Sequence, residues 1–236
     1  MKRAFIQQVA VIVPAHNEVA HIAACLAAVG KAAQRAVHLQ CRVTTYVVCD
    51  SCTDRTAAVV EAAGCAALIV NARSVGAARA WGASAALDAG ADWLAFTDAD
   101  TLVTEDWIVA QLALQCDVVC GTIAVEDWSM HGHAVRREFA NTYQDSDGHR
   151  HIHGANLGMS AAAYRSAGGF AVLTSSEDVA IVEALERAGA TIAWSAAPRV
   201  VTSARIDHRA PKGFGATLLA MGERTHLPPA TPLAAN

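Results

Sequence analysis

Two carboxylates one residue apart, Asp98 and Asp100, are the first candidates for chemistry in this chain. They follow Trp93–Phe96, a short run of apolar side chains that predicts a buried strand. Ligands of open α/β sheets bind beyond the carboxyl ends of the strands, so both acids are expected at the edge of a cleft. Their oxygens suit Mg²⁺ or Mn²⁺, which takes further ligands from water and substrate phosphates. The alternative is a plain surface turn, because Asp also favours turns.

A second acid pair, Glu177 and Asp178, stands at the start of a predicted helix. A positioned carboxylate can take the proton of a hydroxyl group as that group attacks an electrophile. The patterns Ser175-x-x-Asp178 and Thr174-x-x-Glu177 also fit capping boxes, in which the carboxylates only hold the helix start. The residues alone leave both interpretations open.

Five histidines gather in the polar stretch between residues 126 and 153: His131, His133, His149, His151 and His153. A histidine cluster can bind zinc, but this spacing matches no standard zinc pattern. Solvated histidines, or histidines that contact a substrate, are the alternative. The sequence does not decide whether this cluster contacts an acceptor or a metal.

Seven cysteines, an odd number, are scattered through apolar segments. This argues against a disulfide framework and fits a reducing cytoplasm. Cys49 and Cys52 form a C-x-x-C pattern, as in thioredoxin-like redox motifs, although another use of the residues between them is given below. Cys116 and Cys120 have no partner pair at zinc-site spacing and are expected in the core.

Strands and helices are predicted to alternate through the first 125 residues, which is typical of a parallel sheet covered by helices. The predicted strands are 9–13, 42–49, 66–70, 93–96 and 118–123. The predicted helices start near Val19, with Gly30 as a break or end, and at 55–63, 75–87 and 104–115.

The pattern changes after Ala124. The later predicted elements are a helix near 136–143, a turn at 145–148, a helix from 177, strands at 191–194 and 199–202, and a helix at 214–221. Small residues from Gly154 to Ser160 allow close backbone approach to a ligand. We expect one domain of two halves, 1–125 and 126–225, with a disordered tail at 226–236.

Composition excludes several protein classes. The 236 residues are enough for a sizeable core. The hydrophobic fraction is 53%, but much of it is alanine, and no run reaches the ~18 apolar residues of a membrane-spanning helix. The basic N-terminus is not followed by the apolar stretch of a signal peptide. A net charge of −4 argues against broad nucleic-acid binding. We expect a cytoplasmic protein with no integral membrane segment and no nucleic-acid partner.

In order along the chain, six segments resemble the motifs of the family-2 glycosyltransferases of GT-A fold, over about residues 9–218. Each is weak alone, but their order and approximate spacing match. The six are Val11–Glu18, Asp50–Asp54, Gly76–Arg79, Asp98–Asp100, Gly154–Leu157 and Glu177–Asp178. The resemblance implies a Rossmann-like, mostly parallel central sheet flanked by helices, with a smaller mixed region on the acceptor side.

The resemblance also implies an activity. A sugar would move from a nucleotide-diphosphate sugar to the hydroxyl of a small-molecule or lipid-linked acceptor, with inversion and with Mn²⁺ or Mg²⁺ as cofactor. Asp178 would be the general base, with Glu177 as the fallback. Asp50 would accept from the nucleotide base, and Arg79 would reach the phosphates; a solvated helix residue is the alternative for Arg79. The implied donor-binding residues are Pro14, Ala15, His16, Glu18, Asp50, Arg79, Asp98, Ala99, Asp100 and Arg205.

The implied metal ligands are Asp100, Asp98 and His208, although Asp98 could instead lie by the ribose and a solvated loop histidine is an equal alternative for His208. The Q-x-x-R-W segment and the transmembrane helices of processive members do not appear, which favours a single-addition enzyme. A basic loop, Arg205–Lys212, is expected to be a mobile lid over the pyrophosphate. The competing hypotheses are a nucleotidyltransferase, which would need a Gly-rich basic loop after the first strand, and a non-catalytic nucleotide-sugar-binding protein.

Overall fold

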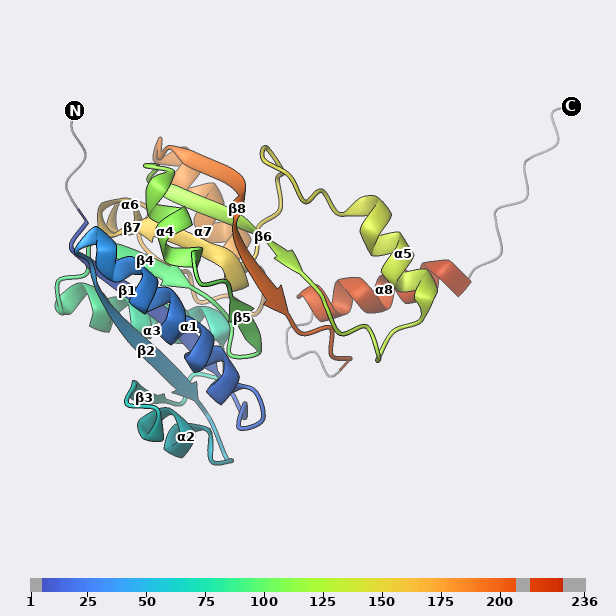
Figure 1. Ribbon diagram of the computed structural model, residues 1–236, viewed down its shortest axis with the longest axis horizontal. Coiled ribbons are helices and arrows are strands. Elements are labelled where there is room, and N and C mark those ends of the chain that lie inside the picture. The colour runs from blue at the N-terminus through green and yellow to red at the C-terminus, as the bar shows by residue number, and fades with distance from the viewer. Residues whose placement is uncertain (1–5, 207–212, 227–236) are drawn as a thin grey trace, which may run out of the picture.

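The protein is described by a computed structural model that covers residues 6–206 and 213–226 (Figure 1). An eight-stranded sheet with the order β3-β2-β1-β4-β7-β6-β8-β5 forms its centre. The strands are β1 (Gln8–Ala15), β2 (Arg42–Asp50), β3 (Ala66–Val70), β4 (Trp93–Phe96), β5 (Thr101–Val103), β6 (Val118–Ala124), β7 (Leu157–Ser160) and β8 (Ile192–Thr202). The helices are α1 (Ile22–Ala36), α2 (Thr56–Ala62), α3 (Val75–Asp88), α4 (Trp107–Ala113), α5 (His133–Thr142), α6 (Ala161–Ser166), α7 (Glu177–Arg187) and α8 (Phe214–His226), with 3₁₀ helices η1 (Val37–Leu39) and η2 (Gly154–Asn156).

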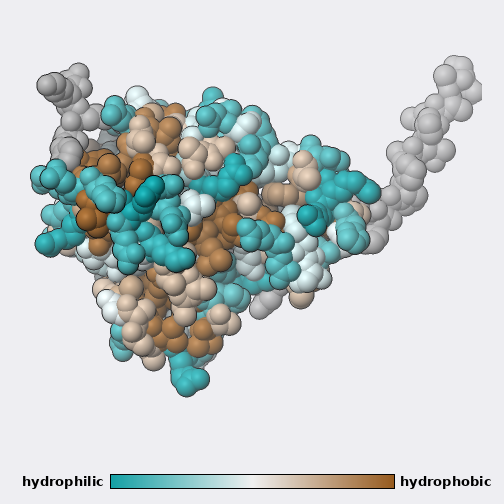
Figure 2. Space-filling view, viewed as in Figure 1, coloured by the Kyte–Doolittle hydropathy of each residue, from teal (hydrophilic) through white to brown (hydrophobic). Residues whose placement is uncertain are grey.

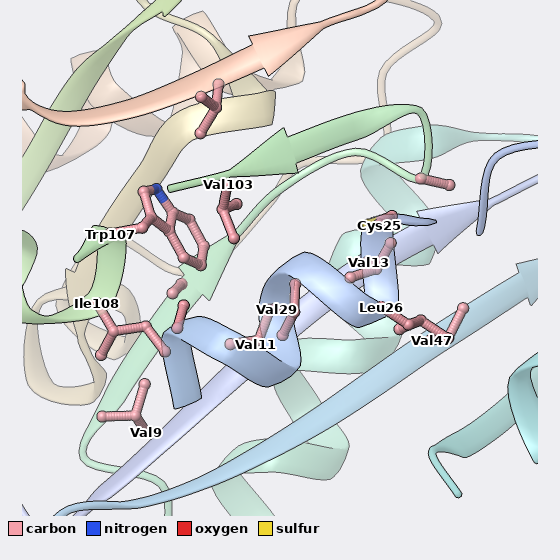
Figure 3. Close-up of a cluster of buried hydrophobic side chains, with 14 of the residues drawn as sticks. Val9, Val11, Val13, Cys25, Leu26, Val29, Val47, Val103, Trp107 and Ile108 are labelled. Atoms are coloured by element: carbon pink, nitrogen blue, oxygen red, sulfur yellow. The ribbon is translucent and has the colours of Figure 1, made fainter. Parts of the chain in front are cut away.

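Strands β3, β2, β1 and β4 are parallel neighbours, as predicted. Side chains alternate between the faces of a strand, and both faces of β1 are buried. Val9, Val11 and Val13 pack with α1 and α4 in the cluster shown in Figure 3, whereas Ala10 and Ile12 pack on the opposite face with α3. Burial on both faces explains why these strands have continuous apolar runs.

The other half of the sheet is mixed. Strand β7 lies antiparallel between β4 and β6, so β6 is not the direct continuation of the parallel sheet. Strand β6 pairs parallel with β8, and β5 pairs antiparallel with β8. Neither β5 nor β7 was predicted, because both are very short and β7 is rich in small residues. At Gly158 of β7 a Cβ atom would meet the side chains of Gln111 and Trp93, so a glycine is needed there.

Two predicted element boundaries are wrong. Helix α1 continues through Gly30, which lies in open space where a glycine only lowers helix propensity. The two late strands are one strand, β8, with a register shift opposite Gly121 and Thr122. Residues 196–198 of β8 have no partner in β6 and bulge out of the pairing, so the sequence looked like two strands with a break between them.

Helices α5 and α8 pack together beside the sheet (Figure 1). Val135 of α5 and Leu218 and Met221 of α8 form a third apolar cluster, with Phe139 and Phe214 against it. The outward surface of α5 is mostly hydrophilic (Figure 2), as expected of an amphipathic helix whose other face packs in an apolar cluster. Helix α8 extends beyond its predicted end and includes residue 226, the first of the predicted tail, and the rest of that tail, 227–236, lies outside the described residues. No helix in the described part of the chain is long and apolar enough to cross a membrane.

Candidate active site

A cleft of about 1290 Å³ opens along the carboxyl ends of β1, β2 and β4. Parallel strands end at one edge of a sheet, so segments far apart in sequence meet there. Every predicted site residue that the structure describes lines this cleft: Pro14, Ala15, His16, Glu18, Asp50, Arg79, Asp98, Ala99, Asp100, Glu177, Asp178 and Arg205. His208 and most of the predicted lid fall within residues 207–212, outside the described residues.

Asp50 organises the loops at one end of the cleft. Its Oδ1 accepts from the N–H groups of Ala72 (2.7 Å) and Arg73 (2.9 Å) and from the Ser51 hydroxyl (2.9 Å), and its Oδ2 accepts from the Ser74 N–H (2.9 Å). Burial alone would raise the pKa of Asp50, but these donors outweigh it and the pKa is lowered. A carboxylate oxygen has about two lone pairs, so only Oδ2 has room for a further donor. The predicted contact with a nucleotide base, which stays a prediction, would have to be made there.

The loops after β1 and β2 are joined by hydrogen bonds. His16 donates from Nδ1 to the Asp50 carbonyl (2.7 Å), which assigns the proton of a neutral ring to Nδ1. The Asn17 side-chain oxygen accepts from the N–H groups of Thr53 (2.7 Å) and Asp54 (3.3 Å). The pocket floor is therefore already rigid without a ligand.

Asp100 lies in a concentration of negative charge. Burial, together with the charges of Asp98 and Glu18, raises its pKa to about 6, although the Arg205 guanidinium acts against this shift. Arg205 contacts the Asp100 carboxylate at 3.1 Å and forms two hydrogen bonds with Glu18, at 2.7 and 3.0 Å. Glu18 was predicted to cradle a nucleoside, but in this structure its carboxylate holds Arg205.

Arg79 is a buried cation and not a solvated helix residue, since only 3% of its side chain is exposed. It bridges the two predicted acid motifs, with ion pairs to Asp98 (2.6 Å) and Glu177. Two glycines make room for this network. A Cβ atom at Gly76 would lie 3.0 Å from Glu177 Cβ, and one at Gly154 would overlap the Arg79 guanidinium. The predicted contact of Arg79 with the donor phosphates stays a prediction.

Replacing Arg79 by methionine should lower the free energy of unfolding by about 3–5 kcal/mol, because the buried Glu177 carboxylate and the partly buried Asp98 carboxylate lose their cation. Urea denaturation measures the change. The control is Arg35→Met, which breaks an exposed ion pair with Asp106 and should change stability by no more than about 1 kcal/mol. Equal effects of the two substitutions would contradict the buried network.

Asp178 points out of its helix. Its Oδ2 accepts from the Gly154 N–H (2.9 Å) and its Oδ1 from the Val179 N–H (2.9 Å). The N-cap of α7 is Ser176, in a left-handed conformation (φ 61°) with no side-chain capping bond. Both predicted capping boxes are therefore out of register. Each Asp178 oxygen keeps lone-pair capacity towards the cleft, as a base needs.

The histidines are mostly not solvated, and none of the acidic, histidine or cysteine side chains in the described ranges form a group of three fit to hold a metal. His149 is fully buried and stacks on His151, which stacks on Tyr143 at 4.1 Å. Because no such group is found there, the zinc interpretation is not supported. His151 and His153 line the cleft.

Burial makes His153 sensitive to acid. Burial, with smaller effects of His151 and His149, lowers its pKa to about 3. Above about pH 6.5 both folded and unfolded chains hold the neutral ring, so stability does not change through His153. Below that pH only the unfolded chain takes the proton, and stability falls by up to about 1.4 kcal/mol per pH unit towards pH 3.

We expect His153→Gln, whose amide oxygen can still accept from Tyr143, to reduce the loss of stability between pH 7 and 5. His133→Gln changes an exposed ring and should leave the wild-type slope. Denaturant titrations at several pH values measure both. If the stability of His153→Gln fell with decreasing pH as steeply as that of the wild type, His153 would have to take a proton in the folded state.

The C-x-x-C pattern has no redox character in this structure. All seven cysteines are free. Burial, followed by the neighbouring Cys52, raises the pKa of Cys49 to about 12, the opposite of the lowered pKa of reactive thiols. Cys120 is buried in the core as predicted, whereas Cys116 is only partly buried.

Sequence motifs did not reveal several residues around the cleft. Tyr143, Phe139 and Phe214 line it, and no local pattern marks them. Asn156 is fully buried, where it accepts from Trp107 Nε1 (2.8 Å) and donates to the carbonyls of Thr122 and Pro198. The predicted acceptor-side segment thus holds β6 and β8 together as well as bordering the cleft.

A family model, Glycosyl transferase family 2, matches residues 10–166, more than half of the chain. The chain belongs to glycosyl transferase family 2. A search of curated proteins finds no significant match.

Solved structures agree with this family. Residues 1–349 of S. aureus TarS in complex with UDP-GlcNAc share 15% identity and a TM-score of 0.66, over 88% of this chain and 62% of that one. M. tuberculosis glucosyl-3-phosphoglycerate synthase with Mn²⁺, UDP and glucosyl-3-phosphoglycerate shares 18% identity and a TM-score of 0.58, over 92% and 80%. The family-2 chain spans 37% of the longer TarS structure. These likenesses confirm the predicted GT-A fold.

Proposed function

We propose that this family-2 protein transfers a sugar from a nucleotide-diphosphate sugar to an acceptor hydroxyl. The observation that supports the proposal is that Asp98, Asp100 and Asp178 line the same cleft, where the buried Arg79 pairs with Asp98 and with Glu177, the neighbour of Asp178 in the chain. The TarS structure with UDP-GlcNAc and the synthase structure with UDP and Mn²⁺ support a nucleotide-sugar donor. The cytoplasmic location, the hexosyl group and the division into two halves stay predictions.

Asp178 is the general base in this proposal. The acceptor oxygen attacks C1 of the donor sugar while the bond from C1 to the diphosphate oxygen breaks. The hydroxyl proton passes to the Asp178 carboxylate, and the nucleotide diphosphate leaves with the bonding electrons. One in-line displacement, with no protein nucleophile, inverts the configuration at C1.

The acids fit a divalent cation. Asp98 and Asp100 supply hard oxygen ligands, and Glu18 adds a third carboxylate near Asp100, whose pKa is raised mainly by burial. When bound, Mn²⁺ or Mg²⁺ would offset the charge that develops on the diphosphate. Arg205, which contacts Asp100 in this structure, would exchange that partner for the diphosphate when the donor enters.

Thermal unfolding with each nucleoside diphosphate, with and without Mn²⁺, tests the donor site. A ligand at 100 times its Kd stabilises the folded state by about 2.7 kcal/mol. We expect one nucleoside diphosphate to raise Tm only when the metal is present. We also expect the protein to hydrolyse the corresponding nucleotide sugar slowly, with release of the nucleoside diphosphate, when water takes the place of the acceptor. Release of pyrophosphate from a nucleoside triphosphate would instead show a nucleotidyltransferase. Binding without any turnover on any acceptor would show a non-catalytic protein.

A further inference from the structure

The first turn of α7, which carries the proposed base, begins without the usual stabilising contact. Many helices begin with a side chain that accepts a hydrogen bond from a free N–H group of the first turn. Ser176, the N-cap of α7, makes no such side-chain bond to that turn, and its left-handed conformation (φ 61°) is uncommon for a residue other than glycine. A backbone conformation of this kind persists when the surrounding structure stabilises it.

Glu177 provides a stabilising contact from outside the helix. It is the first residue of α7, only 7% of its side chain is exposed, and its Oε1 pairs with Nη1 of Arg79 on α3. The backbones also approach closely, because a Cβ atom at Gly76 of α3 would lie 3.0 Å from both Cβ and Cγ of Glu177. The start of α7 is therefore fixed against the start of α3 by an ion pair and by close packing.

Arg79 also reaches the proposed base from a second direction. Its guanidinium occupies the space that a Cβ atom of Gly154 would need, and the Gly154 N–H donates to Asp178 Oδ2 at 2.9 Å. Burial alone would lower the pKa of the guanidinium, but the charges of Asp98, Glu177 and Asp178 outweigh burial and raise this pKa. A permanent cation thus lies beside the two residues that hold the base, its neighbour in the chain and its hydrogen-bond donor.

We propose that Glu177 is a positioning residue, whose ion pair with Arg79 holds the first turn of α7 so that the Asp178 carboxylate faces the reacting hydroxyl. This inference rests on the proposed glycosyl transfer and gives Glu177 a role other than that of a second base. A base must lie about 2.6–3.2 Å from the oxygen whose proton it takes. A displacement of about 1 Å can lower the rate about 100-fold, so the position of this turn matters for turnover.

Hydrogen exchange of the Gly154 amide measures the position of Asp178 without any substrate. Glu177→Ala removes the ion pair and should speed this exchange about tenfold or more, whereas Glu177→Gln keeps an oxygen for Arg79 and should stay within about threefold of the wild type. The amide of Ile12, in the buried strand β1, reports global stability. Unchanged exchange at Gly154 in Glu177→Ala, or an equal increase at Ile12, would overturn the proposal.

Hydrolysis of UDP-GlcNAc and other nucleotide sugars with Mn²⁺ measures kcat, with water in place of the acceptor. Glu177→Ala should lower kcat about tenfold or more with donor Kd unchanged within about twofold, and Glu177→Gln should keep at least about a third of the wild-type kcat. A fall of about 100-fold or more in both variants would show that Glu177 is itself the base and would overturn the proposal. Absence of hydrolysis and transfer by the wild type with every nucleotide sugar would instead overturn the proposed function, whereas the exchange at Gly154 still tests the positioning contact.

Gly76→Ala tests the position of the base without removing a polar group. The added methyl group would press on Glu177 and on the Ala171 carbonyl, so the chain leading into α7 must shift by a few tenths of an ångström. We expect kcat to fall about threefold or more, with donor Kd unchanged within about twofold. The matched control is Gly30→Ala on α1, where the added Cβ meets no atom of the described residues within 4 Å, and its kcat should equal that of the wild type. Wild-type kcat and wild-type exchange at Gly154 in Gly76→Ala would contradict the positioning role.

Discussion

Asp178→Asn is expected to lower kcat by about 100-fold or more and to leave donor Kd nearly unchanged. The amide keeps an oxygen for the Gly154 N–H and loses only the acceptor for the exposed Val179 N–H, but it cannot take the acceptor proton. Initial rates at saturating donor, together with donor titrations, separate the two effects. The product should have inverted anomeric configuration, read by NMR.

The control for Asp178 lies on the same helix. Glu183→Gln also changes a carboxylate to an amide, but its side chain is 57% exposed and pairs only with Arg187 one turn away. Its kcat should equal that of the wild type. If Asp178 had a purely structural role, Asp178→Asn would have a lowered Tm and a nearly normal kcat. A product of retained anomeric configuration would exclude a single displacement, whatever the kinetics of the variants.

Asp100→Ala should abolish the metal-dependent rise in Tm with nucleoside diphosphate and lower transfer by about 100-fold or more. The folded protein without ligand should be as stable as the wild type or more stable. The raised pKa of Asp100 gives the sign, because a carboxylate whose folded pKa exceeds its unfolded value is disfavoured by folding at neutral pH. Arg205 keeps its two hydrogen bonds with Glu18 in this variant.

Asp106→Ala is the matched control for Asp100. Asp106 is an exposed acid that pairs with Arg35 outside the cleft, so ligand binding and transfer should be unchanged. Unimpaired metal-dependent binding by Asp100→Ala would contradict the metal site. So would full activity of the wild type after exhaustive chelation.

The sequence alone determined which acids face the cleft. Apolar runs of strand length followed by polar residues predicted β1, β2 and β4, and parallel strands necessarily end at one edge of a sheet. The order of strand ends along the chain therefore sufficed to bring Asp50, Asp98 and Asp100 together. Local hydrophobic patterns carry this information because burial on both faces requires it.

Only the tertiary structure decided which charges pair. Arg79 and Glu177 are 98 residues apart, and Glu18 and Arg205 are 187 apart. No periodicity records such partners, because they depend on β7 entering the sheet between β4 and β6 and on glycines that let Arg79 and Glu177 approach. Phe139 and Phe214 likewise meet only when α8 packs against α5. Local patterns in the sequence thus placed the acids at the cleft, whereas long-range packing set their partners and their protonation.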